Sequence, residues 1–450
     1  MNRPLSRMPM PARRLLRSLR NVVFGVLLAL AALVPARAGV EIAEVTSPGG
    51  ITAWLVEDHT LPFVSFEIRF RGGAALDRPG KEGETMFMAG LLEEGAGEMD
   101  SRAFAREVER LGADFAFDAD LVGVNVSAKM LTEDLADAAD LLRLALTRPR
   151  FDPSAIDRVR GQVLAYIDSR EKDPEAIASR MLMARLFAGH PFGRPPEGTR
   201  ASVERIGRDD LLQAHRRALS RDHLVIGVAG DITPEALAPL LDRIFADLPA
   251  RGAPLPPRTV PKVAGAVETQ PFPSPQSVIL FAQRGIDRTD PDFFAAHVLN
   301  QIIGGGFNAR LMQELREKRG LTYGIGTWLA DLGPAEYWGG QTRTVNATAG
   351  QAVALIRKVW ADVAAGNITE DELQAAKRYM TGSYPLRFDS NGRIAAILAG
   401  MQIAGFPRDY PNFRNARIEA VTLADLKRVA RRLMTPDRLE FVVVGRPEGL

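Results

Sequence analysis

The sequence contains no cysteine, which excludes disulfide bonds and thiolate metal sites. It also lacks a G-x-S-x-G nucleophile elbow and the Lys-Ser/Thr phosphate cradle of a P-loop. Histidine is scarce, and its five positions are scattered without a recognisable zinc-ligand spacing: His59, His190, His215, His223 and His297. The residue types therefore give no support for an autonomous serine hydrolase or a nucleotide-binding enzyme.

A strong net charge is missing as well. The chain has 57 Lys and Arg against 55 Asp and Glu, so its net charge of +2 indicates no nucleic-acid partner. Hydrophobic residues make up 46% of the 450 residues, which is enough apolar material for globular cores. A chain of this length is typical of roughly two to four domains.

The apolar run near the N-terminus, Val22–Val34, is too short for a comfortable membrane span. It follows an arginine-rich, acid-free segment (1–20) and precedes Ala36-Arg37-Ala38, a small-x-small cleavage site. This order predicts a secretory signal peptide over residues 1–38, with Gly39 as the mature start. We therefore expect an exported, periplasmic protein with no membrane attachment after cleavage. An uncleaved anchor and a mitochondrial targeting segment are the alternatives.

An internal repeat appears when residues 210–230 are aligned with residues 425–445. The alignment needs no gaps and keeps a constant offset of 215. Each segment has the pattern of a helix, a short turn and a buried strand. A repeat this long indicates two structurally similar halves rather than a solenoid of short units. The matching pairs are Asp210/Asp425, Leu211/Leu426, Arg216/Arg431, Arg217/Arg432, Asp222/Asp437, Leu224/Leu439, Val228/Val443 and Gly230/Gly445.

A proline-rich linker separates the two predicted halves. Five prolines between Leu248 and Val263 favour extended chain and oppose a continuing helix. We assign residues 39–248 to the N-terminal half, 249–263 to the linker and 264–450 to the C-terminal half. Strands and helices do not alternate one for one in either half. This favours an α+β fold made of two duplicated two-layer α/β domains, with helices packed on largely antiparallel sheets.

Three consecutive glycines, Gly304–Gly306, separate two predicted helices in the C-terminal half. The second helix ends at Gly320, a residue suited to a left-handed cap, and residues 321–325 then alternate like a half-buried strand. Arg316 lies in the last helical turn and Tyr323 on the predicted strand. From residue types alone, Arg316 complements a helix C-terminus and Tyr323 packs in a sheet.

The whole pattern, G-G-G-x-x-x-R-L-x-x-x-L-R-E-K-x-G-L-x-Y, resembles the C-terminal half of pitrilysin/insulinase-type metallopeptidases. That family includes mitochondrial processing peptidases and two-subunit bacterial relatives, and the resemblance covers nearly the whole mature chain. In active members, an Arg and a Tyr at this spacing face the zinc site and hold the peptide carbonyl under attack. The resemblance therefore implies catalytic roles for Arg316 and Tyr323. It implies substrate contacts for the glycine-rich loop, namely Gly304, Gly305, Gly306 and Asn308.

Active members also carry H-x-x-E-H on a helix of the N-terminal half, where two His bind zinc and the Glu is the general base. A later helix supplies a further Glu ligand. The predicted helix Met86–Glu94 takes the place of the motif helix, and alignment on Gly95 identifies the equivalent positions. These positions are Met86, Ala89, Gly90 and, for the later Glu, Tyr166. Because these side chains are not zinc ligands, we expect no metal or other cofactor in this chain.

The alignment also pairs Arg316 and Tyr323 with Val108 and Phe115 of the N-terminal half, so the polar pair is not a by-product of the repeat. The resemblance implies a zinc-less companion subunit, whose homologous partner with H-x-x-E-H binds zinc and hydrolyses a peptide. The alternative is a peptide-binding or scaffolding pseudopeptidase with no role in catalysis. The peptide substrate, and the choice between a heterodimer and a homodimer, stay open at this point.

Overall fold

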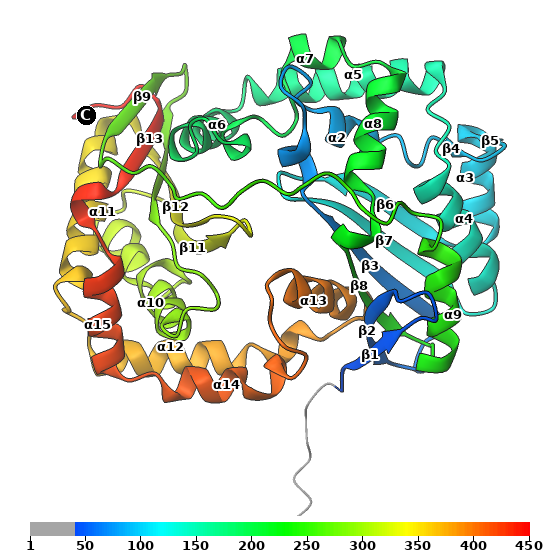
Figure 1. Ribbon diagram of the computed structural model, residues 1–450. Helices are drawn as coiled ribbons and strands as arrows, with labels where there is room; N and C mark the ends of the chain where they lie inside the picture. The colour runs from blue at the N-terminus through cyan, green and yellow to red at the C-terminus, as the bar shows by residue number, and fades with distance from the viewer. Residues whose placement is uncertain (1–40) are drawn as a thin grey trace, which may run out of the picture. The chain divides into compact units, whose positions relative to one another are not determined.

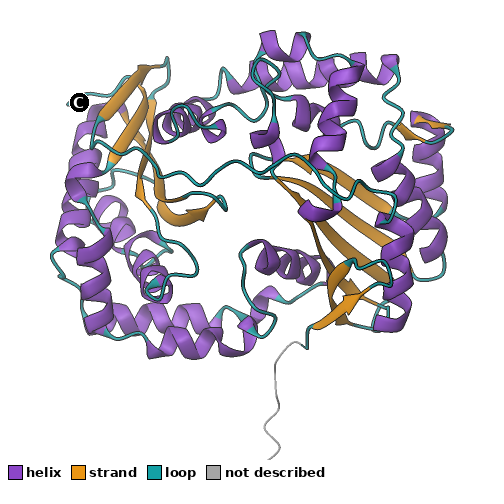
Figure 2. Ribbon diagram, in the orientation of Figure 1, coloured by secondary structure: helices purple, strands orange, loops and turns teal. Residues whose placement is uncertain are grey.

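The computed structural model describes residues 41–450, so the predicted signal peptide lies outside the described residues. The described chain contains two main β-sheets, each with helices packed against it (Figure 1, Figure 2). A separate two-stranded ribbon is formed by β4 (Gly95–Ala96) and β5 (Met99–Asp100).

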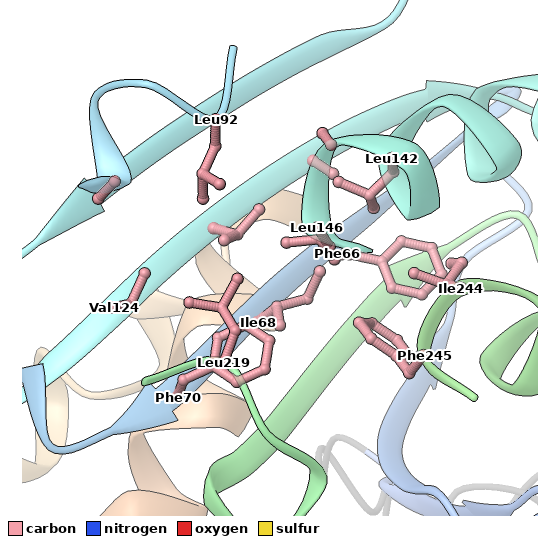
Figure 3. Packing of buried hydrophobic residues seen from close by; sticks show 14 of the residues in the cluster. Phe66, Ile68, Phe70, Leu92, Val124, Leu142, Leu146, Leu219, Ile244 and Phe245 are labelled. Atoms are coloured by element: carbon pink, nitrogen blue, oxygen red, sulfur yellow. The ribbon is translucent and has the colours of Figure 1, made fainter. Parts of the chain in front are cut away.

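The N-terminal sheet has six strands in the order β1-β2-β8-β3-β7-β6. All neighbouring strands are antiparallel except β2 and β8. Alternation along β3 places Phe66, Ile68 and Phe70 in one apolar core with side chains of the helices α4 (Leu135–Thr147) and α9 (Pro234–Phe245) (Figure 3). The strands are β1 (Ala43–Thr46), β2 (Thr52–Glu57), β3 (Phe63–Arg71), β6 (Asp114–Ala119), β7 (Gly123–Leu131) and β8 (Leu224–Gly230).

The C-terminal sheet has five strands in the order β11-β12-β10-β13-β9. Again one pair, β13 and β9, is parallel and the others are antiparallel. Its core contains Phe281, Trp338, Trp360 and Phe441, all fully buried. The strands are β9 (Val267–Pro271), β10 (Gln276–Arg284), β11 (Ile325–Asp331), β12 (Glu336–Val345) and β13 (Glu440–Gly445).

The two sheets share one topology. The order β2-β8-β3-β7-β6 corresponds to β9-β13-β10-β12-β11, with the parallel pair at the same place. Val228 pairs with Phe66, and Val443, 215 residues later, pairs with Ile279 at the equivalent position. The predicted duplication and the predicted α+β class are therefore confirmed.

Helices cover each sheet on the face that carries its main apolar core. Among the helices of residues 41–450, none has the length and apolarity to cross a bilayer. The N-terminal helices are α2 (Glu84–Ala89), α3 (Ser101–Arg110), α4 (Leu135–Thr147), α5 (Pro153–Arg170), α6 (Pro174–Leu186), α7 (Arg200–Glu204), α8 (Arg208–Ala218) and α9 (Pro234–Phe245). The C-terminal helices are α10 (Phe293–Gly304), α11 (Ala349–Ala364), α12 (Glu370–Gly382), α13 (Asn391–Ile403), α14 (Tyr410–Ala420) and α15 (Leu423–Leu433).

One helix of the N-terminal half packs on the C-terminal sheet. Helix α6 contacts β10 and β13, where its Ala178, Leu182 and Leu186 join an apolar cluster with the outer face of that sheet (Figure 1). Beside this cluster, Arg185 of α6 donates a 2.7 Å hydrogen bond to the buried carboxylate of Glu440. The other oxygen of Glu440 accepts the amides of residues 264–266 at 3.0–3.2 Å, which anchors the chain entering the second half.

The reciprocal contact is made by α13, which belongs to the C-terminal half and packs on β8, β3 and β2 (Figure 1). The Nε2 of Gln402 donates to the carbonyl of Ile226 at 2.8 Å. The approach is so close that a Cβ at Gly227 would lie 2.1 Å from the carbonyl oxygen of Ala395. The two halves therefore exchange one helix each, which the sequence pattern did not predict.

The predicted helix over residues 86–94 is shorter than expected and begins earlier. Helix α2 ends at Ala89, and Gly90 is its C-terminal cap. The amides of Leu91 and Leu92 then donate to carbonyls only three residues back, at 3.1 Å, so the chain continues in tight turns. The apolar residues after Ala89 suggest a longer helix, but they lie in a turn that packs on the core.

Candidate functional site

Arg316 lies in a π-helical turn, Met312–Glu317. The amide of Lys318 donates to the carbonyl of Gln313, five residues back, at 3.0 Å. Gly320 then reverses the chain at φ 61°, and its amide donates to the carbonyl of Arg316 at 2.8 Å. The left-handed glycine cap predicted at the end of this helix is confirmed.

Tyr323 lies on a short loop, because β11 begins only at Ile325. The predicted strand over residues 321–324 is therefore wrong. The Oγ1 of Thr322 accepts the amide of Gly324 at 3.1 Å and donates to its carbonyl at 2.8 Å, which closes the loop. The side chain of Tyr323 is 89% exposed. The interpretation of Tyr323 as a residue packed in a sheet is thus excluded.

The sheet register also corrects the predicted counterpart of Tyr323. Phe115 pairs with Ala128 on β7, and Ile325 pairs with Thr342 at the equivalent place on β12. Phe115 therefore corresponds to Ile325, not to Tyr323. The strand position lies five residues after the helix-ending glycine in the C-terminal half and three residues after it in the N-terminal half. These two additional residues give the C-terminal half the loop that carries Tyr323.

A groove of about 510 Å³ lies beside Tyr323, over β11 and β12. Its other wall is the start of α6, where Glu175 accepts hydrogen bonds from Gln341 at 2.8 Å and from Arg343 at 2.6 Å. Trp328, 36% exposed, also lines the groove. Within the described residues, β11 is an edge strand of its sheet, so its outer backbone groups have no strand partner.

The glycine-rich loop divides into a buried and an exposed part. Gly304 is buried, and a Cβ there would lie 2.5 Å from Oγ1 of Thr327. A Cβ at Gly305 would lie 2.6 Å from the backbone of α10. The lack of a side chain at these two positions therefore has a packing reason. Gly305 and Gly306 are partly exposed and Asn308 is exposed, and the substrate contact of the loop stays a prediction.

Arg316 is oriented by the same loop. Its guanidinium carbon lies 4.6 Å from the ring centroid of Phe307, and its Nε lies 3.6 Å from a carboxylate oxygen of Glu317. The Arg316 side chain is 34% exposed. Arg316 is not among the residues that line the groove beside Tyr323.

The positions that correspond to the zinc motif lie at the end of α2. Met86 is partly buried, Ala89 is fully buried, and a Cβ at Gly90 would lie 3.6 Å from Cγ1 of Val159 on α5. Tyr166, also on α5, is 47% exposed. Across residues 41–450, no three His, Asp or Glu side chains gather in a geometry that could hold a metal ion. The zinc-ligand positions are therefore apolar and aromatic in this chain.

His215 and His190 each contact a backbone carbonyl of another segment. The Nε2 of His215 lies 2.8 Å from the carbonyl oxygen of Leu146, and burial lowers the pKa of His215. His190 contacts the linker, with its Nε2 3.1 Å from the carbonyl oxygen of Pro257. Both therefore connect elements of the fold.

Sequence reasoning missed most of the groove. Trp328 carries a weak signal, because it occupies an outward position of an alternating strand. Glu175 carries no signal in the sequence, because it belongs to the other half of the chain. It lies 168 residues before its partner Arg343. The groove exists only because α6 packs on the C-terminal sheet.

Comparison with known proteins gives a consistent result. A family model described as insulinase (peptidase family M16) matches residues 53–200, and one described as peptidase M16 inactive domain matches residues 205–380. An uncharacterized zinc protease of Mycobacterium bovis is 31% identical over 337 residues, covering 72% of this chain and 74% of the relative. The non-peptidase homolog YmxG of Helicobacter pylori is 25% identical over 390 residues, covering 86% of this chain and 90% of the homolog.

A solved structure agrees with the described fold. The crystal structure of a peptidase M16 inactive domain from Pseudomonas fluorescens matches with a TM-score of 0.84 at 28% identity, covering 90% of this chain and 98% of that one. Three features of the chain agree with these matches: the duplicated sheets, the glycine-rich loop and the substituted H-x-x-E-H positions. The chain therefore belongs to the insulinase (M16) family of peptidases, as a member without the zinc motif.

Proposed function

We propose that this chain is the non-catalytic subunit of a two-subunit zinc peptidase. In this proposal, Arg316 and Tyr323 bind the carbonyl of a peptide held at the H-x-x-E-H site of a homologous partner. The observation that carries the proposal is the 89% exposure of Tyr323 on a loop closed by Thr322. A large aromatic side chain held this far into solvent is available to a ligand or a partner.

The chemistry of the pair suits an oxyanion. The Tyr323 hydroxyl is an O–H donor, and the Arg316 guanidinium carries a permanent positive charge. Donors fixed in advance around a developing negative charge stabilise the transition state of peptide hydrolysis. The partner's zinc, when bound, would supply an activated water molecule. This chain would contribute the hydrogen bond and the positive charge.

We propose a heterodimer rather than a homodimer. Met86, Ala89, Gly90 and Tyr166 supply neither imidazole nor carboxylate, so two copies of this chain would lack both the metal and the general base. The predicted signal peptide supports a periplasmic complex. N-terminal sequencing of the protein from the periplasmic fraction tests this localisation, and the expected first residue is Gly39.

The test is a peptidase assay on the complex with an H-x-x-E-H homologue. We expect Tyr323→Phe to lower turnover roughly 100- to 1000-fold, because removing one oxyanion donor costs about 2.7–4 kcal/mol. The complex should still form, since only a solvent-exposed hydroxyl is lost. Tyr379→Phe is the matched control, because Tyr379 is a second exposed tyrosine (58%) on α12 and should leave turnover unchanged.

The scaffolding alternative has one structural observation in its favour. The groove over β11 and β12 and the unpaired edge of β11 could bind an extended peptide without any chemistry by this chain. If the complex forms and the double variant Arg316→Ala/Tyr323→Phe keeps full activity, the catalytic role is wrong. The peptide-binding or scaffolding role then replaces it.

A further inference from the structure

We propose that Phe307 is a positioning residue for Arg316. Phe307 lies in the glycine-rich loop and is 63% exposed, although a phenylalanine side chain gains nothing from contact with water. Its ring lies under the guanidinium of Arg316, with 4.6 Å between the ring centroid and the guanidinium carbon. This separation lies within the range of a cation–π contact.

Among the described residues, no carboxylate lies within hydrogen-bond distance of the Arg316 guanidinium, so the Phe307 ring is its main neighbour. Glu317 approaches Nε of Arg316 only to 3.6 Å, beyond the distance of a hydrogen bond. The neighbouring cations are held differently, since Lys318 and Arg319 both bind the carboxylate of Glu314, at 2.5 and 2.6 Å. Arg316 is thus oriented by an aromatic face and keeps its N–H donors free of a short carboxylate contact.

The two segments that carry the contact are packed or hydrogen-bonded at their backbones. Phe307 follows the crowded glycines Gly304 and Gly305, whose neighbours leave no room for a side chain. Arg316 belongs to the π-helical turn, whose five-residue hydrogen bond widens the helix at this point. The ring and the guanidinium are therefore presented by two packed segments, and the stacking restrains the long side chain of Arg316 between them.

The role follows from what an oxyanion site requires. A donor that is already oriented loses less conformational entropy when the transition state forms. Stacking on Phe307 would hold the Arg316 guanidinium in place and leave its positive charge intact. A carboxylate contact would neutralise that charge. This inference depends on the proposed function for its catalytic consequence, whereas the stacking itself can be measured without a partner.

The first measurement uses the isolated chain with isotope-labelled arginine. Ring currents of Phe307 should displace the side-chain resonances of Arg316, identified by their loss in Arg316→Lys. We expect this displacement to disappear in Phe307→Leu and to persist in Phe307→Trp. Glu317→Gln is the matched control and should leave it in place. An undisplaced Arg316 resonance in the unmodified chain would overturn the inference, whatever the protein does.

The second measurement uses the complex with the zinc-bearing homologue. We expect Phe307→Leu to lower kcat/KM about two- to fivefold, the size of an exposed cation–π contact, and Phe307→Trp to restore it. In an Arg316→Ala background, Phe307→Leu should have no further effect, because its action passes through Arg316. Additive losses would overturn the inference and assign Phe307 to direct contact with peptide or partner. Full activity of Arg316→Ala alone would overturn the proposed function and, with it, the positioning role.

Discussion

At the scale of single residues, Tyr323 and His297 illustrate two opposite environments. Tyr323 is lifted out of the sheet by a loop two residues longer than its counterpart in the other half. His297 lies on α10, where its ring stacks on Phe293 one turn earlier, with 5.9 Å between the ring centroids. Burial lowers the pKa of His297 to about 4, and the nearby positive charges of three arginines, Arg414, Arg387 and Arg288, act in the same direction.

The shifted pKa of His297 predicts a loss of stability in mild acid. An unfolded histidine titrates near pH 6.5, so the unfolded chain takes up a proton before the folded one does as pH falls. The stabilisation is complete above about pH 6.5 and is lost progressively down to about pH 4. His297 should therefore contribute a decrease on the order of 1–2 kcal/mol to the free energy of unfolding between pH 7 and pH 5, measured as the difference between the unmodified chain and His297→Gln in urea titrations.

Two variants isolate this contribution. His297→Gln cannot titrate, so its stability should change less between pH 7 and pH 5 than that of the unmodified chain. His59→Gln is the matched control, because a hydrogen bond to Asp231 raises the pKa of His59 and its stabilisation is lost as pH rises. An identical pH dependence for His297→Gln and the unmodified chain would show that His297 titrates normally in the folded state.

At the scale of elements, the exchanged helices α6 and α13 each cover the outer face of the opposite sheet. Helix α13 approaches β8 closely enough to require a glycine, because a Cβ at Gly227 would collide with the carbonyl of Ala395 at 2.1 Å. The equivalent position of β13, 215 residues later, is Val442, which packs in the apolar cluster under α6. The two docking contacts are therefore related by the repeat but built from different side chains.

The close approach of α13 predicts a large effect for a single methyl group. Gly227→Ala should lower the free energy of unfolding by about 1–3 kcal/mol, because the helix must move away from the sheet. Gly161→Ala is the matched control. Gly161 lies inside α5 with open space around a Cβ, so this change should raise stability by about 0.5–1 kcal/mol. Equal effects of the two variants in urea titrations would contradict the close docking of α13.

At the scale of the whole described chain, the linker is held along its length. The amide of Gly252 donates to Asp222 at 2.9 Å, and the amide of Lys262 donates to the carbonyl of Leu186 at 2.8 Å. Arg258 binds Asp287 at 3.0 Å. Of these contacts, the one between Lys262 and Leu186 joins the C-terminal end of the linker to α6 of the N-terminal half, and it acts together with the exchanged helices.

Cutting the linker should therefore leave the protein assembled. A protease site introduced at Leu255, which is 44% exposed, allows specific cleavage between the halves. We expect the two fragments to elute together from a size-exclusion column and to separate only in denaturant, since α6 and α13 each bury an apolar face on the opposite sheet. Two separate peaks under native conditions would mean that the helix exchange alone does not hold the halves together.

Part of the site could be predicted from local patterns. The turn at Gly320 was predictable, because a helix that ends at glycine uses a left-handed backbone which other residues avoid. In a strand, Leu321, Tyr323 and Ile325 would share one face, but Leu321 and Ile325 are buried and Tyr323 is exposed, so the predicted strand alternation is wrong here. The sequence does not show the loop, because it depends on the hydrogen bonds of the Thr322 hydroxyl to the backbone of Gly324.

By itself, the sequence determined the duplication, the α+β class, the family and the loss of the zinc ligands, because these depend on residue identity and on short-range periodicity. Only the tertiary structure decided the helix exchange, the groove beside Tyr323 and the stacking of Phe307 on Arg316. In α6 and α13 the apolar residues are spread around the helix rather than along one stripe, so neither sequence indicates a partner surface. Which sheet each helix covers depends on the apolar face left open by the opposite half, and that is settled only when both halves are folded.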